Sequence, residues 1–105
     1  MGNCSSQSKV ATAPKRKKRI SAALREAVWN TWIGPSVGSH PCLCCRRNEI
    51  RQLSFHCGHV LAETNGGQTT IDNLRPICAK CNLSMGKQDM REFQKQTFPN
   101  ADKVP

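Results

Sequence analysis

Two pairs of closely spaced cysteines constrain this chain of 105 residues more than any other feature of its sequence. Two residues separate the cysteines within each pair, Cys42 and Cys45 and then Cys78 and Cys81, and 32 residues separate the pairs. A C-x2-C knuckle lets two thiolates reach one ion across a tight turn, and Zn²⁺ accepts four sulfurs in a tetrahedron. A chain this short buries only a small core, so we predict that a structural zinc ion holds it together through these four cysteines.

The other cysteines leave alternatives open. The total of seven is odd, and the sequence shows no signal peptide or membrane span, so we expect a reducing, intracellular location with metal ligation rather than disulfides. Cys44 could replace Cys45 as a ligand, although the two-residue spacer favours Cys45. The first knuckle followed by Cys57 and His59 is spaced like the first half of a RING finger, but residues 60–66 lack the Cys or His that should follow. Some of the four knuckle cysteines could also be free thiols in the core.

The positive charge is concentrated at the N-terminus. The net charge is +9, and residues 1–19 contain six basic residues and no acidic one, so we expect them to form a disordered basic tail. The tail begins with MGNCSS, which matches the pattern for myristoylation of Gly2 with palmitoylation of the adjacent Cys4. The basic run at residues 15–19 would then bind an anionic membrane. The alternative is that this run is a nuclear import signal or a non-specific arm for DNA.

The remaining chain is typical of one small α+β domain over residues 20–98, followed by a disordered C-terminus at residues 99–105. Ser21 is a suitable helix N-cap, and apolar residues at Leu24, Val28 and Trp32 follow with helical spacing. We therefore expect an N-terminal amphipathic helix over residues 21–33. The other expected elements are a strand at 53–60, a turn at 65–68, a second hairpin strand at 69–71, a chain break at Pro76, and helices at 78–86 and 89–98.

Between the cysteine pairs, several motifs follow one another in a characteristic order. They are His59, the Gly66-Gly67 turn, Asn73-Leu74, and Asn82 directly after the second knuckle. Thirteen residues separate His59 from Asn73, and eight separate Asn73 from Asn82. This pattern resembles the HNH endonuclease family with its ββα-metal motif. The segments VWNTWIG and CNLSMGKQDMREF are similar to those of small HNH proteins encoded by large DNA viruses of eukaryotes.

The resemblance implies a metal-dependent endonuclease that hydrolyses DNA. His59 would be the general base, a role that suits a histidine because its pKa lies near working pH. Asn73 would orient His59 or the scissile phosphate, and Asn82 would be a ligand of a catalytic Mg²⁺ or another divalent cation. The zinc ion would be structural only, because four cysteine ligands leave no open position.

One position departs from the family pattern. Where the family has an Asp or His ligand before its catalytic histidine, this chain has Gly58. His56, Cys57 or Glu63 could supply a substitute, and strand alternation places Cys57 on the same face as His59 and His56 on the opposite face. The chain is therefore either a nuclease with a different ligand or softer metal, or a catalytically inactive zinc-binding module for nucleic acid or an adaptor function, tethered to a membrane by its tail.

Four arginines near these motifs are candidate phosphate contacts, although a solvated basic face would explain them equally well. They are Arg46, Arg47, Arg51 and Arg75. The expected location is the nucleus or the cytoplasmic membrane face of a eukaryotic cell, including a virus-infected one.

Overall fold

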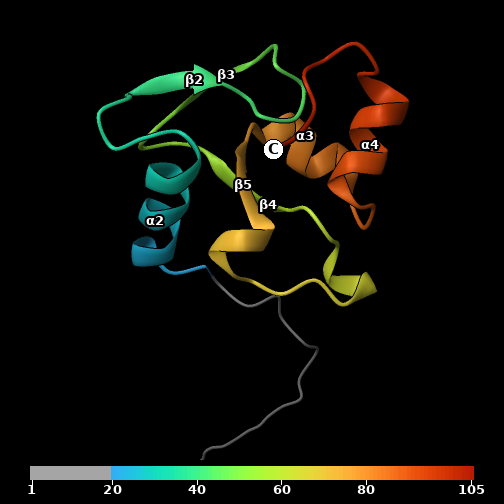
Figure 1. Cartoon of the computed structure of the whole chain (residues 1–105), viewed down its shortest axis with the longest axis horizontal. Coiled ribbons are helices and arrows are strands. Elements are labelled where there is room, and N and C mark those ends of the chain that lie inside the picture. The colour runs from blue at the N-terminus through green and yellow to red at the C-terminus, as the bar shows by residue number, and fades with distance from the viewer. Residues whose placement is uncertain (1–19) are drawn as a thin grey trace, which may run out of the picture.

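The computed structural model describes residues 20–105 (Figure 1). The acylation signal at Gly2 and Cys4 and the basic run at residues 15–19 lie outside the described residues. Within the described part, no helix is both long and apolar enough to cross a membrane.

The described residues form a small α+β fold with two separate two-stranded antiparallel sheets. The chain also makes two short 3-10 turns, Glu63–Asn65 and Ile71–Asn73. The helices and strands, in chain order, are α2 Ala22–Trp32, β2 Ser39–Pro41, β3 Glu49–Arg51, β4 His56–His59, β5 Leu74–Ile77, α3 Ala79–Met85 and α4 Met90–Thr97. In Figure 1, β4 and β5 cross the middle of the molecule, with α2 on one side and α3 and α4 on the other.

The N-terminal helix begins where its sequence predicts. The Ser21 hydroxyl accepts a hydrogen bond from the backbone N–H of Leu24 at 3.1 Å, which satisfies one of the unpaired donors of the first turn. The helix buries Val28 and Trp29 completely. The Trp29 ring packs against Phe55 with 5.0 Å between ring centroids, so α2 closes one side of the core.

The central hairpin differs from the expected one in its second strand. The predicted strand at residues 69–71 is wrong, because Ile71–Asn73 is a 3-10 turn and the strand is β5, which begins at Leu74. Pro76, expected to break the chain, lies inside β5 opposite Cys57. All four residues of β5 are buried, so the strand lacks the polar alternation by which a half-exposed strand is recognised in a sequence.

The β2–β3 hairpin was not predicted. It pairs His40 with Ile50 and encloses the first cysteine knuckle in its loop. Only Ile50 of its six residues is buried, so the segment carries little hydrophobic signal. Arg46 has a φ of 60°, the left-handed conformation needed to turn the knuckle.

The two C-terminal helices follow the prediction closely, but the segment after them does not. Residues 99–105, expected to be disordered, pack on the domain: Val104 is only 4% exposed, and its N–H donates to the side-chain oxygen of buried Gln94. The backbone carbonyl of Pro105 accepts from Arg75 and Arg91, both at 3.0 Å. Gln94, Arg75 and Arg91 thus hold residues 99–105 on the domain, although this segment has few apolar side chains to bury.

Candidate active site and metal centre

The four knuckle cysteines meet at one point between the β2–β3 hairpin and α3. All four sulfurs lie within 4.8 Å of one another. The Sγ atoms of Cys42 and Cys81 are 3.9 Å apart, and those of Cys45 and Cys78 are 4.0 Å apart. In a tetrahedron with Zn–S bonds of about 2.3 Å, the sulfurs lie about 3.8 Å apart. The cluster therefore fits a structural metal ion such as zinc, as the two knuckles predict.

Backbone and side-chain donors surround these sulfurs. The N–H groups of Cys44 and Cys78 donate to Cys42 Sγ at 3.3 and 3.2 Å, and the Asn48 amide donates to Cys78 Sγ at 3.3 Å. Such bonds stabilise thiolate charge when a cation is bound. Without a cation, the hydrogen bond that the Cys42 thiol donates to Cys81, together with burial, raises the pKa of Cys42 to about 12. Cys44 is fully buried but does not belong to the cluster, which favours Cys45 as the ligand.

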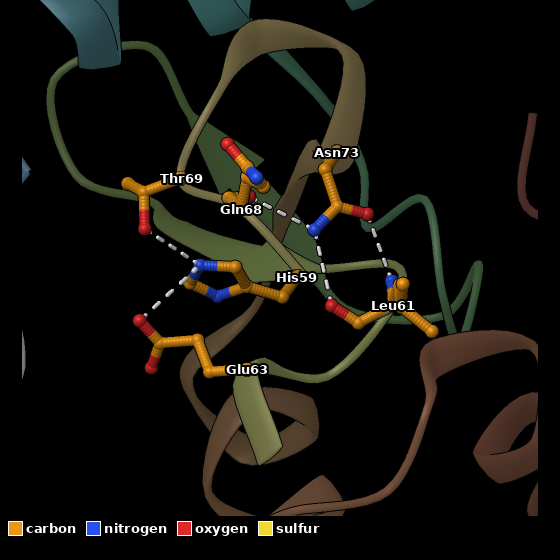
Figure 2. A network of polar contacts seen from close by, with 6 residues as sticks. All are labelled: His59, Leu61, Glu63, Gln68, Thr69 and Asn73. Carbon is orange, nitrogen blue, oxygen red and sulfur yellow. Dashed lines mark hydrogen bonds and ion pairs between the residues drawn. The ribbon is translucent and has the colours of Figure 1, made fainter. Parts of the chain in front are cut away.

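His59, the predicted general base, is the last residue of β4, and its side chain is 19% exposed. Its Nε2 atom lies 3.1 Å from the hydroxyl of Thr69 and 3.8 Å from a carboxylate oxygen of Glu63. Figure 2 shows the ring held between these two side chains. Sequence reasoning did not single out Thr69, and it considered Glu63 only as a substitute metal ligand. Both lie in the loop between β4 and β5, where only the folded chain brings them to His59.

Asn73 faces the backbone of the same loop in Figure 2. Its side-chain oxygen accepts from the N–H of Leu61 at 2.8 Å, and its NH₂ group donates to the carbonyls of Leu61 and Gln68 at 3.0 and 2.9 Å. These three bonds join the two ends of the loop that carries Glu63 and Thr69. Asn73 therefore positions the neighbours of His59.

The Gly66-Gly67 turn is needed for this closed loop. Gly66 has a φ of +95°, which favours glycine strongly. A Cβ atom on Gly67 would overlap the carbonyl of Leu61 and come within 2.9 Å of the Asn73 amide. The glycine pair in the motif is thus required by the close packing of the backbone against Leu61 and the Asn73 amide.

A groove of about 390 Å³ opens beside His59. Glu63 and Lys87 line it, and Asn82, which projects from α3, contributes to the same wall. The structure therefore brings the predicted residues His59 and Asn82 to one groove and adds a carboxylate and an ammonium group to it.

Gly58 faces away from this groove. A Cβ atom added there would overlap the side chain of Ile77 and lie 2.8 Å from Met90 Cε, so the direction of a side chain at this position points into the core. Within residues 20–105, the cysteine cluster is the only group of three or more His, Cys, Asp or Glu side chains close enough to share an ion. The residues at the groove therefore do not fit a Mg²⁺ ion held by paired carboxylates.

The three possible substitute ligands lie at different places around β4. Glu63 lies at the His59 ring. Cys57 is half-buried, and burial raises the pKa of its thiol, although the charge of Arg25 on α2 opposes this rise. The third, His56, lies beside Asn82 with 3.3 Å between Nδ1 and the amide nitrogen.

The four predicted phosphate contacts differ in their accessibility. Arg75 is 5% exposed, stacks on Trp32 at 3.5 Å from the ring centroid, and donates to the carbonyls of Asp72 and Leu74. Its burial argues against a phosphate contact and for a structural role. Arg46, Arg47 and Arg51 lie nearer the surface, although Arg46 donates to two C-terminal carbonyls.

The family comparison agrees with this geometry. The family model for HNH endonuclease matches residues 42–88, from the first cysteine ligand to the wall of the groove. The match covers 47 of the 105 residues, so this segment is similar to the HNH family. No curated protein and no solved structure matches the chain. The matched segment includes the cysteine cluster, His59, Asn73 and Asn82, whereas α2 and α4 pack against it from outside the match.

Proposed function

We propose that this HNH protein is an endonuclease that hydrolyses phosphodiester bonds of DNA, with His59 as its general base. The observation that carries the proposal is the placement of His59 at a groove, with its Nε2 atom between Thr69 and Glu63, inside a domain of a nuclease family. Because its neighbours hold the ring in one orientation, the ring can take a proton from a water molecule on a fixed side of the groove.

The neighbours of the ring favour one of its two neutral tautomers. A carboxylate can only accept hydrogen bonds, so Glu63 favours the tautomer in which Nε2 carries the hydrogen. The lone pair then lies on Nδ1, which takes a proton from a water molecule as its oxygen attacks the phosphorus. The negative charge of Glu63 stabilises the imidazolium that forms. The bond from phosphorus to the leaving oxygen breaks, and that oxygen takes a proton from solvent, while His59 later returns its own proton to solvent.

The cysteine cluster would hold zinc and would contribute structure rather than chemistry. Four sulfur ligands leave no position for water or substrate. The cluster joins the loop of the β2–β3 hairpin to the start of α3, and α3 carries Asn82. Zinc would thus fix one wall of the groove relative to β4.

Binding to DNA would depend mainly on charge. The exposed Arg47 and Arg51 and the groove residue Lys87 are candidates for phosphate contacts. The basic run at residues 15–19 would add sequence-independent affinity. We therefore expect weak sequence specificity.

A nicking assay on supercoiled plasmid tests the proposal. The full chain is assayed with Mg²⁺, Mn²⁺, Ni²⁺ and Zn²⁺ in turn, and His59→Ala is compared with the original protein. Loss of a general base lowers rates by about 10²- to 10⁴-fold, so the variant should leave the plasmid supercoiled. Equal nicking by both proteins in every metal would refute the proposal.

The alternative is a zinc-containing binding module without catalysis, and the direction of Gly58 favours it. Such a module would bind nucleic acid or a protein partner, and acylation of Gly2 and Cys4 would tether it to the cytoplasmic face of a membrane. Intact mass after co-expression with an N-myristoyltransferase tests the tether. An unmodified Gly2 would remove the membrane location and leave the nucleus as the expected one.

A further inference from the structure

Ser21 is an exposed serine that follows a dense basic run in the sequence. Five basic residues occupy positions 15–19, and only Ile20 separates them from Ser21. Many serine/threonine kinases select their substrates by charge, because acidic groups in the kinase groove bind Lys or Arg shortly before the acceptor hydroxyl. The sequence before Ser21 has the charge pattern that such a basophilic kinase recognises.

This pattern distinguishes Ser21 from the other hydroxyl residues between 20 and 105. Four of the five positions before Ser21 are Lys or Arg. No other serine or threonine in that part of the chain has more than one Lys or Arg among its five preceding positions. Ser54, which is also exposed and has Arg51 before it, is therefore a suitable control.

The surroundings of Ser21 leave it accessible to a kinase. Its backbone is extended, with φ −68° and ψ 158°, and the next two residues, Ala22 and Ala23, are exposed as well. Its hydroxyl oxygen accepts from the Leu24 N–H, so the hydroxyl hydrogen remains available. A kinase would need to open only the first turn of α2, and helix ends open at little cost.

The reaction would add a phosphoryl group to the hydroxyl. The Ser21 oxygen attacks the γ-phosphorus of ATP while its proton passes to a carboxylate of the kinase, and ADP leaves as its bond to that phosphorus breaks. A neutral side chain thereby gains about two negative charges at pH 7. The first turn of α2 contains no acidic residue, so the phosphate oxygens can accept from its N–H groups and the helix keeps its cap.

The phosphate would lie beside the residues that hold His59. Ser21 lines a hollow of about 500 Å³ together with Glu63 and Thr69, which both contact the His59 ring. Glu63 also lines the groove that contains His59, so the hollow and the groove adjoin at this residue. Charges within about 10 Å of one another still interact at cellular ionic strength, so a phosphate here would repel the DNA backbone.

We infer that Ser21 is a phosphorylation site for a basophilic serine/threonine kinase, and that its phosphate weakens the binding of DNA at the groove of His59. The first half stands on the sequence before Ser21 and on its exposure. The second half deepens the proposed function and rests on it, because it requires DNA to bind at this groove.

Phosphorylation of the full-length, zinc-loaded protein tests the first half. The protein is incubated with ATP, Mg²⁺ and the catalytic subunit of cyclic-AMP-dependent protein kinase, and mass spectrometry counts and locates the phosphate. We expect one phosphate per chain, on Ser21, both in the original protein and in Ser54→Ala, whereas Ser21→Ala should remain unmodified.

A second variant guards against loss of the helix cap in Ser21→Ala. Replacing Lys18 and Arg19 together by alanine leaves the Ser21 hydroxyl in place and should slow its phosphorylation about tenfold. Equal rates in this double variant and the original protein, or equal incorporation of phosphate by Ser21→Ala and Ser54→Ala, would overturn the site.

Affinity for a duplex oligonucleotide tests the second half without catalysis. Fluorescence anisotropy compares the phosphorylated with the unmodified protein, and Ser21→Asp with Ser21→Asn, since both variants cap a helix but only aspartate is charged. We expect phosphorylation to weaken binding about three- to tenfold and Ser21→Asp to bind more weakly than Ser21→Asn, with both differences smaller at high salt. Equal affinities of the phosphorylated and unmodified proteins would overturn the effect on DNA.

The outcomes for the two proposals are separable. Weaker DNA binding after phosphorylation of a protein that nicks no plasmid would keep this inference and refute the nuclease. Nicking that depends on His59, in a protein whose Ser21 the kinase does not modify, would keep the nuclease and refute this inference.

Discussion

At the scale of the residue, His59 depends on two neighbours in the loop that follows it, Glu63 and Thr69. Thr69 and Glu63 hold the same ring nitrogen, one through a hydroxyl and one through a charge. Arg75, by contrast, was expected to lie at the surface and contact phosphate, but its guanidinium is buried on the Trp32 ring. In both cases the role of a polar side chain is determined by what the folded chain places around it.

Removing the Thr69 hydroxyl should misorient the base without removing it. We expect Thr69→Val to lower the nicking rate about tenfold, which corresponds to about 1.4 kcal/mol for one hydrogen bond that strengthens as the ring becomes charged. Single-turnover nicking measures the change. Thr70→Val is the matched control, because the neighbouring Thr70 makes no capping hydrogen bond through its side chain. Equal losses in both variants would contradict an orienting role.

At the scale of the element, the loop between β4 and β5 is a structural unit in its own right. Asn73 closes it through bonds to Leu61 and Gln68, Gly67 lets the two ends approach, and Asp89 ties it to the start of α4. The unit carries Glu63 and Thr69, which both contact the His59 ring. Changes that loosen it should therefore reduce activity even where they lie away from the ring.

Gly67 should be the position in this loop least tolerant of a side chain. We expect Gly67→Ala to lower the free energy of unfolding by about 2 kcal/mol or more, because its Cβ overlaps the Leu61 carbonyl. Gly38→Ala should have little effect, since no atom lies within 4 Å of its added Cβ. Thermal or denaturant unfolding of the zinc-loaded proteins compares the two. A Gly67→Ala protein as stable as Gly38→Ala would contradict the close packing.

Asp89 should stabilise the loop in its charged form only. Its carboxylate accepts from the Ala62 N–H at 2.8 Å and from the Asn65 amide at 3.0 Å, and these bonds lower its pKa. Because the folded-state pKa lies below the ordinary value, the contribution is complete above that ordinary value and is lost as pH falls through the lowered one.

The Asp89→Ala variant tests this contribution at neutral pH. We expect a lower melting temperature and faster hydrogen exchange at the Ala62 amide, whose acceptor is lost. Asp102→Ala offers a comparison at another acid, since the bonds to Asp102 from Arg46 and Gln94 go to its backbone carbonyl. Unchanged exchange at Ala62 in Asp89→Ala would show that the loop does not depend on this carboxylate.

At the scale of the whole molecule, two anchors hold short elements together. The cysteine cluster joins the β2–β3 hairpin to α3, and Gln94 joins α4 to Cys44 and to the C-terminal segment. The hairpin strands have three residues each and bury little. We infer that the fold depends on a bound ion for its cooperativity.

Removal of the ion by a chelator should therefore unfold the domain. The adjacent residues Cys44 and Cys45 should differ in their importance for zinc binding. We expect Cys45→Ser to lose bound zinc, whereas Cys44→Ser should keep one zinc per chain, because Cys44 lies outside the cluster. Apparent zinc affinity should fall as pH falls, since protons compete for thiols such as Cys42, whose pKa is raised to about 12 without an ion. Zinc content by mass spectrometry and competition with a chelator at several pH values measure both. Retention of zinc by Cys45→Ser would contradict the proposed ligand set.

The sequence by itself determined the features whose geometry is local. The two C-x2-C knuckles predicted the cysteine cluster, the Ser21 cap predicted the start of α2, and the spacing from His59 to Asn82 predicted the match to the HNH family model. Capping and knuckle geometry depend on residues a few positions apart, so the chain order is sufficient to recognise them.

Only the tertiary structure decided the features that depend on contacts across the chain. It placed the second strand at β5 rather than residues 69–71, brought Thr69 to His59, and turned Gly58 toward the core. It also set His56 beside Asn82. The physical reason is that a strand buried on all sides shows no periodicity, and a side chain that points across an interface leaves no pattern along the sequence.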